Sequence, residues 1–208
     1  MNTERLVAEN FLKMEVVKLN PNEPFLWSSG WWSPIYCDSR LSLSYVSERR
    51  FIQNRMAVMI NNNFAKIDAI CAVAEGGVPM GALIAHILDL PLFSMHPAWI
   101  KLTKNDLEPK RRILVFDDIT STGISSLSVV KALKEAGHTV LGVVSLFTYG
   151  FKEAETNFKI WDVSAYALTN LNTLCDVALE TGYLKSEELD AIKKFSKDPV
   201  NWYKNLNK

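Results

Sequence analysis

The sequence has little of what secreted, membrane-spanning or nucleic-acid-binding proteins usually contain. Its three cysteines, Cys37, Cys71 and Cys175, are scattered and lack C-x-x-C spacing, which favours neither a disulfide framework nor a zinc site. No apolar run approaches the roughly 20 residues of a membrane span, and the amino terminus lacks the apolar core of a signal peptide. The 23 basic and 23 acidic residues cancel, so neither a nucleic-acid surface nor an acidic tail is indicated. We therefore expect a cytoplasmic protein.

What the chain does contain fits a globular protein with a substantial core. Its 208 residues, 48% of them hydrophobic, suit a single domain over 1–208, with an N-terminal helix and hood region over 1–45 and a core with a C-terminal helix over 46–208. Residues 19–40, LNPNEPFLWSSGWWSPIYCDSR, hold three prolines and three tryptophans and are too aromatic for a linker. We expect this segment to form a structured hood.

Apolar runs and amphipathic segments alternate along the chain. We expect strands over residues 67–74, 91–95, 113–116, 139–146 and 160–168. Helical periodicity predicts helices over 3–14, 44–64, 82–88, 153–158 and 170–179, a helix that ends at Gly137, and a terminal helix that begins near Ser186. This alternation predicts an α/β fold, an open and mainly parallel sheet flanked by helices on both faces. Ligands of such sheets lie at the carboxyl ends of the strands, where the loops 75–81, 117–125 and 147–151 should meet.

The stretch 113–125, ILVFDDITSTGIS, has the strongest functional pattern. Four apolar residues are typical of a buried parallel strand, and they stop at Asp117 and Asp118. A hydroxyl-rich turn with Gly123 then leads into a helix, whose amino terminus presents backbone N–H groups and partial positive charge to a phosphate. Carboxylates close by can hold sugar hydroxyls or Mg²⁺. The alternative is a strand that simply ends in two acids, but the whole pattern favours a receptor for a phosphorylated sugar.

A second strand, 67–74, also ends in a turn suited to an anion. Its last residues are followed by Glu75, Gly76 and Gly77 and then by an apolar helix. Two adjacent glycines let the backbone approach a ligand closely. This turn is therefore a second candidate anion cradle.

The stretch 113–125 resembles the phosphoribosyl-pyrophosphate (PRPP) signature of type I phosphoribosyltransferases. The rest of the chain narrows the resemblance to orotate phosphoribosyltransferases, in the family's order: SSGWWSPIYCD resembles their S-G-x-x-S-P-x-Y segment, VAEGGVPMGALIA their pyrophosphate loop, and GVVSLFTYGFKEAE and KDPVNW later segments. The resemblance implies the type I phosphoribosyltransferase fold. It also implies transfer of phosphoribosyl from PRPP to orotate, which gives orotidine monophosphate and pyrophosphate.

The resemblance also implies a role for each matching residue. Asp117 and Asp118 would contact the ribose hydroxyls. The 5′-phosphate would be held by Thr120, Ser121, Thr122, Gly123, Ile124 and Ser125. Glu75, Gly76 and Gly77 would face the pyrophosphate, and Ser33, Tyr36 and Tyr149 would border the base. Mg²⁺ would be held mostly by PRPP itself, with Asp117 and Asp118 as possible protein ligands, and the protein would be a homodimer.

The chain departs from the family where the catalytic loop would lie. The family carries an arginine, lysines and a D-H-G there, whereas this chain has a shorter segment with Met95, Pro97 and Trp99 at the cation positions. Lys101 and Lys104 are the candidate replacements. Because neutralising the leaving pyrophosphate is the main catalytic demand, two alternatives stay open. One is a catalytically degenerate paralogue that binds PRPP or a nucleoside monophosphate, and the other is a phosphoribosyltransferase for another base.

The tryptophans allow two interpretations. Trp27, Trp31, Trp32 and Trp99 could stack on a base or form a subunit interface, where such residues concentrate. Four indoles exceed what one base can use, so we favour the interface.

Overall fold

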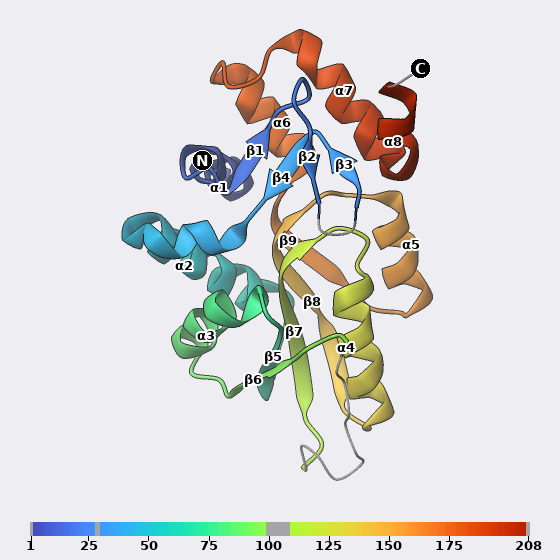
Figure 1. The fold of residues 1–208 in the computed structure, drawn as a ribbon. Coiled ribbons are helices and arrows are strands. Elements are labelled where there is room, and N and C mark those ends of the chain that lie inside the picture. Colours follow the sequence, from blue (N-terminus) through green and yellow to red (C-terminus); the bar gives the residue numbers. More distant parts are fainter. Residues whose placement is uncertain (1, 28–29, 99–108, 207–208) are drawn as a thin grey trace.

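A five-stranded parallel sheet forms the centre of the molecule in the computed structural model, which describes residues 2–27, 30–98 and 109–206 (Figure 1). The spatial order of the strands is β6-β5-β7-β8-β9. Their bounds are Ala69–Val73 for β5, Leu92–Met95 for β6, Arg112–Thr120 for β7, Thr139–Thr148 for β8 and Ala165–Asn170 for β9. The long strand β7 lies in the middle, as the apolar run at its start predicts.

Helices cover both faces of this sheet, which confirms the expected α/β architecture. Successive residues of β7 alternate between two cores: Leu114 and Phe116 belong to one, Ile113 and Val115 to the other. The first core is completed by α1 (Thr3–Lys13), α2 (Val46–Asn63), α3 (Gly77–Leu88) and α6 (Leu171–Glu180), the second by α4 (Ile124–Glu135) and α5 (Lys152–Ile160). Among the described residues, none of the helices is long and apolar enough to cross a membrane.

The hood lies over the carboxyl ends of β7 and β8 (Figure 1). It is built from short antiparallel pairs: β1 (Val17–Leu19) with β4 (Ile35–Cys37), and β2 (Phe25–Leu26) with β3 (Trp32–Ser33). A 3₁₀ helix, η1 (Ser39–Ser44), leads from the hood to α2. The C-terminal helices α7 (Ser186–Lys197) and α8 (Pro199–Leu206) lie beside the hood, so both ends of the chain contribute to the region above the sheet.

Several element boundaries differ from the predicted ones for local reasons. Asn2 rather than Thr3 caps α1, because the Asn2 side chain accepts a hydrogen bond from the backbone N–H of Glu4 at 3.0 Å. Strand β7 continues through both acids to Thr120, since its ladder with β8 pairs Asp117 with Ser145 and Thr120 with Thr148. Asp117 and Asp118 therefore lie within the paired part of β7 rather than after the strand.

Two other element boundaries also differ from the predicted ones. Helix α3 begins at Gly77, so the expected turn 75–81 is shorter than predicted. The expected strand 160–168 begins only at Ala165, because α5 extends to Ile160 and Asp162 turns the chain with a φ of 49°. The element types nevertheless agree with the predictions along the core.

Candidate functional site

Asp117 is held inside the protein. Its side chain is 5% exposed; Oδ2 accepts a hydrogen bond from Ser126 Oγ at 2.5 Å and Oδ1 accepts one from the backbone N–H of Asp118 at 3.0 Å. Burial raises the pKa of Asp117, the neighbouring charge of Asp118 raises it further, and the bond from Ser126 opposes this rise. Asp117 thus joins the end of β7 to the first turn of α4.

Asp118 is half-exposed and lies where three chain segments meet. Its Oδ2 accepts a hydrogen bond from Ser39 Oγ of η1 at 2.5 Å. Gly76, just before α3, packs so closely that a Cβ at this position would lie 2.6 Å from the same oxygen. Any side chain at position 76 would therefore displace the Asp118 carboxylate or the turn. Of the two acids, Asp118 is the one accessible to a ligand.

The turn between β7 and α4 has the geometry of an anion receptor. Gly123 has a φ of 76° and is the N-cap residue just before the 12-residue helix α4. The first N–H groups of a helix have no partner within it, and they point outward with the positive end of the helix dipole. Helix α5 supports this turn from behind: Asn157 Nδ2 donates to the carbonyl of Thr122 at 3.1 Å, and a Cβ on Gly123 would meet the ring of Phe158 at 3.0 Å.

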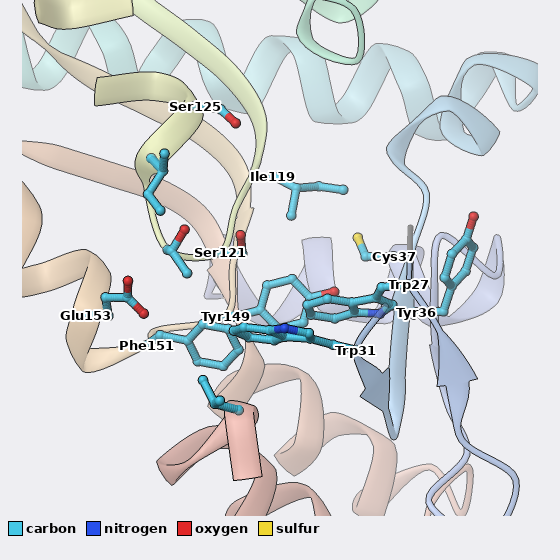
Figure 2. A pocket seen from close by; sticks show the side chains of 13 residues that line it. Trp27, Trp31, Tyr36, Cys37, Ile119, Ser121, Ser125, Tyr149, Phe151 and Glu153 are labelled. Atoms are coloured by element: carbon cyan, nitrogen blue, oxygen red, sulfur yellow. The ribbon is translucent and has the colours of Figure 1, made fainter. Parts of the chain in front are cut away.

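A cavity of about 740 Å³ opens beside this turn (Figure 2). Its lining residues are Trp27, Trp31, Tyr36, Cys37, Ile119, Ser121, Thr122, Ile124, Ser125, Tyr149, Phe151, Glu153 and Val200. Figure 2 shows Ser121, Ser125 and Glu153 on one side and Cys37 and Tyr36 on the other, with Trp31 and Tyr149 between them. We name the side formed by Ser121, Thr122 and Ser125 the hydroxyl end, and the side formed by Trp27, Trp31, Tyr36 and Tyr149 the aromatic end.

A chain of touching rings supports the aromatic end. Tyr149 lies 5.4 Å from Trp27 and 5.2 Å from Phe151, and Phe195 of α7 lies 5.9 Å from Trp27 and 5.8 Å from Phe151, all between ring centroids. Trp202 of α8 continues the chain at 5.8 Å from Phe195. We name these five residues the aromatic cluster.

The cluster shows how one of the tryptophans packs. Trp27 is half-buried within the chain, and its Nε1 donates to the carbonyl of Ile35 at 2.9 Å; the interface interpretation of the tryptophans stays a prediction. Trp31 lines the cavity, and Trp99 lies outside the described residues.

The structure brings together most, but not all, of the predicted site residues. Ser121, Thr122, Ile124, Ser125, Tyr36 and Tyr149 line one cavity, and Gly76 meets Asp118 beside it. Ser33, expected to border the base, is fully buried; its hydroxyl donates to the carbonyl of Ile35 at 2.8 Å and shapes the turn between β3 and β4. Thr120 is also buried and donates to Ser145 Oγ at 3.1 Å.

The remaining predicted residues lie elsewhere. Glu75 is exposed and Gly77 is buried against the backbone of β7. Met95 ends β6 as an 8%-exposed core residue, so its side chain is committed to packing. Lys101 and Lys104 lie outside the described residues.

Sequence reasoning missed several residues of the site. Phe151 is the last residue of the predicted loop 147–151 and Glu153 follows it closely, and their place just after a strand end was the available signal. Ser39 and Val200 come from η1 and α8, and no local pattern marks either as a site residue.

Curated relatives match this chain over nearly its whole length. Curated orotate phosphoribosyltransferases from Bacteroides fragilis and Bacteroides thetaiotaomicron are 41% and 42% identical over 206 residues, each match covering 97% of this chain and 97% of the relative. The orotate phosphoribosyltransferase of Listeria innocua is 37% identical over 209 residues. The search against protein-family models gave no match.

Solved structures show the same fold. The crystal structure of orotate phosphoribosyltransferase from Aeropyrum pernix superimposes with a TM-score of 0.71 at 27% identity, covering 85% of this chain and 99% of that one. The Mycobacterium tuberculosis orotate phosphoribosyltransferase in complex with PRPP has a TM-score of 0.62 at 20% identity, covering 83% of this chain and 98% of that one.

Proposed function

The chain belongs to the orotate phosphoribosyltransferase family, and on this premise we propose that it transfers the phosphoribosyl group of PRPP to orotate, giving orotidine monophosphate and pyrophosphate. The observation that carries the proposal is a cavity with a helix amino terminus at its hydroxyl end and stacked rings at its aromatic end, in a chain similar to such enzymes over 97% of its length. The protein would thus act as a glycosyltransferase in pyrimidine nucleotide biosynthesis.

The hydroxyl end is suited to the 5′-phosphate of PRPP. The N–H groups at the start of α4 and the hydroxyls of Ser121, Thr122 and Ser125 are donors on one wall of the cavity. An anion there also gains from the helix dipole. This wall would fix one end of PRPP and so place the ribose beside the end of β7.

Asp118 would accept hydrogen bonds from the ribose hydroxyls, while the buried Asp117 would orient the strand end beneath it. The close approach of Gly76 to Asp118 supports a pyrophosphate site at the turn before α3, next to the ribose of the same ligand. The reaction passes through an oxocarbenium-like transition state, so groups that stabilise the departing pyrophosphate contribute most.

The aromatic end is suited to a planar base. Trp31, Tyr36 and Tyr149 line it with ring faces and edges, and stacking on such rings stabilises a heterocycle with little dependence on hydrogen-bond pattern. The aromatic cluster holds Tyr149 in a fixed orientation from behind. These residues would keep the reacting base in line with the ribose.

Mg²⁺ would accompany PRPP. Within the described residues no three His, Cys, Asp or Glu side chains gather to hold a metal ion. Mg²⁺ commonly combines one or two carboxylates with the phosphates of its substrate, and the half-exposed Asp118 fits that pattern. When bound, the ion would neutralise charge on the pyrophosphate. We also propose that the protein works as a homodimer, as the family resemblance implies, and in the cytoplasm, as its composition predicts.

A turnover assay tests the proposal. Purified protein with PRPP, orotate and Mg²⁺ should release pyrophosphate and form orotidine monophosphate. Asp118→Asn should lower kcat/KM by about 100- to 1000-fold, the usual cost of removing one electrostatic contact to a developing charge. Val58→Ala, at an exposed position of α2, serves as the control. The absence of turnover with wild-type protein would contradict the assignment to catalysis.

One observation favours a second candidate, binding of PRPP or a nucleoside monophosphate without transfer. Met95 is buried in the core at a position where the family's catalytic cations would fall, which leaves Lys101 and Lys104 as the proposed replacements. Calorimetry would then show PRPP binding without turnover, and grafting the family's Arg/Lys loop onto residues 95–105 would restore transfer. A panel of bases in the same assay distinguishes the use of another base.

A further inference from the structure

We propose that Ser39 is a positioning residue that holds Asp118 in place and couples the aromatic end of the cavity to the ribose-binding carboxylate. The inference rests on the proposed function, because it assigns Asp118 to the ribose. It concerns a residue outside the motifs that mark the family, contributed by η1 rather than by the sheet.

The contact itself is short and shielded. Ser39 is 5% exposed, and its Oγ donates to Asp118 Oδ2 at 2.5 Å. A carboxylate has about four acceptor sites, so one bond from a serine leaves acceptor capacity for the hydroxyls of a sugar. Gly76 packs against the same carboxylate from the side of α3. Ser39 and Gly76 together therefore restrict the rotation of Asp118.

Ser39 belongs to a turn with several hydrogen bonds. Its carbonyl accepts a hydrogen bond from Ser42 Oγ at 2.6 Å. On its other side, Asp38 accepts from Arg40 Nε and Nη2, both at 2.7 Å, and its backbone N–H donates to the carbonyl of Val16 at 2.8 Å. A bidentate pair of this kind fixes orientation as well as distance. The hydroxyl of Ser39 is thus presented to Asp118 by a hydrogen-bonded turn.

This turn is continuous with the strand that lines the aromatic end. Tyr36 and Cys37 of β4 line the cavity, and Ser39 follows them in the same segment. A base that packs against Tyr36 would stabilise β4 and hence the orientation of Ser39. Through the bond to Asp118, that ordering would reach the ribose site. Since coupling between two ligands is reciprocal, PRPP would strengthen base binding by the same factor.

Removing the hydroxyl should therefore weaken PRPP binding and uncouple the two ligands. A hydrogen bond to a charged group commonly contributes enough that its loss lowers affinity about tenfold. We expect Ser39→Ala to raise the Kd and KM of PRPP about tenfold, with a smaller change in kcat. The strengthening of PRPP binding by orotate, measured as the ratio of PRPP Kd values with and without orotate, should fall towards one.

The experiment compares wild-type protein, Ser39→Ala and the control Ser44→Ala by calorimetry and steady-state kinetics. Ser44 lies on the same 3₁₀ helix but is exposed, so its variant should behave as wild type. A double-mutant cycle adds Asp118→Ala. If Ser39 acts through Asp118, Ser39→Ala should change the PRPP Kd less than about threefold in that background, because the partner is gone.

The outcomes separate the inference from its premise. Two results would overturn the role of Ser39 while leaving the proposed function intact. One is a tenfold loss of PRPP affinity that is equal in the wild-type and Asp118→Ala backgrounds. The other is a Ser39→Ala variant whose PRPP affinity and coupling to orotate are both unchanged. Wild-type protein that neither binds nor turns over PRPP would overturn the proposed function, and the inference with it. The positioning role is supported if Ser39→Ala lowers PRPP affinity only in the wild-type background and abolishes the coupling between PRPP and orotate.

Discussion

The two ends of the cavity are built from the chain in opposite ways. The hydroxyl end comes from one uninterrupted turn, residues 120–125, between β7 and α4. The aromatic end is assembled from the hood and the loop after β8, and the helices α7 and α8 support it through the aromatic cluster, although these segments are far apart in the sequence. The first depends on local backbone geometry, whereas the second depends on tertiary packing between distant segments.

This difference predicts that the two ends can be damaged separately. Backbone changes near Asp118 should impair handling of the sugar phosphate while leaving the fold stable. Changes in the aromatic cluster should lower stability and base binding together, because the same rings serve both. The predictions below test that separation.

The largest effect should come from Phe195→Ala. Phe195 is fully buried and contacts Trp27, Phe151 and Trp202. Deleting a buried phenyl ring leaves a cavity and typically lowers the free energy of unfolding by about 3–5 kcal/mol, which denaturant titration would measure. The KM of orotate should rise more than that of PRPP. Phe93→Ala, at a half-buried position of β6, is the matched control. Equal increases in the two KM values would contradict a separate aromatic end.

Gly76→Ala should impair the handling of the sugar phosphate rather than the aromatic end. The added Cβ would lie 2.6 Å from Asp118 Oδ2, so the carboxylate or the turn must move. A displacement of about 1 Å near reacting atoms can cost about 100-fold in rate. We expect kcat/KM to fall by about that factor while the unfolding free energy changes little. Val78→Ala, which adds no atom near Asp118, should retain activity. A Gly76→Ala enzyme with normal kinetics would show that Asp118 need not be held closely.

The same contrast explains what the sequence could predict. The stretch 113–125 carries its own signals, an apolar strand, two acids and a glycine turn, so the strand and the helix were predicted correctly, and the anion receptor between them stays a prediction. Gly123 has the positive φ that such a turn requires. A site made by one continuous segment is largely encoded in that segment.

The aromatic end could not be predicted in this way. Nothing near Trp27 in the sequence indicates that it packs on Tyr149 and Phe195, because those contacts span more than a hundred residues. Ser33 was misassigned for a related reason: a serine in a turn can face a ligand or satisfy its own backbone, and the burial that decides between them is tertiary. No sequence pattern predicted the hydrogen bond from Ser39 to Asp118 either.

Asp117 provides a test based on pH. Burial and the charge of Asp118 raise its pKa above the ordinary value of 3.8. A carboxyl with a raised folded-state pKa favours folding when protonated, so its contribution is present below the unfolded pKa and is lost as pH rises through the folded pKa. Wild-type stability should therefore fall as pH increases above about 4. Asp117→Asn should flatten this dependence and gain about 1–2 kcal/mol relative to wild type near neutral pH.

Denaturant titrations from pH 4 to pH 8 would measure that dependence, with Asp176→Asn, at an exposed position of α6, as the control. The comparison of the two ends adds a second readout: because Asp117 supports the start of α4 through Ser126, the KM of PRPP should change and that of orotate should not. Parallel pH profiles for wild type and Asp117→Asn would show that Asp117 is ionised without penalty.

The smallest effect should come from Asn157→Ala, which probes the hydroxyl end from behind. Asn157 donates to the carbonyl of Thr122 at 3.1 Å, and its loss should cost about 0.5–1.5 kcal/mol. This predicts a rise of about three- to tenfold in the KM of PRPP with an unchanged KM of orotate. Thr156→Ala removes only a bond from the Thr156 hydroxyl to the carbonyl of Lys152 within α5, and it should leave both values unchanged. If Asn157→Ala instead raised the KM of orotate, helix α5 would serve both ends of the cavity, and the division between a locally encoded and an assembled end would no longer hold.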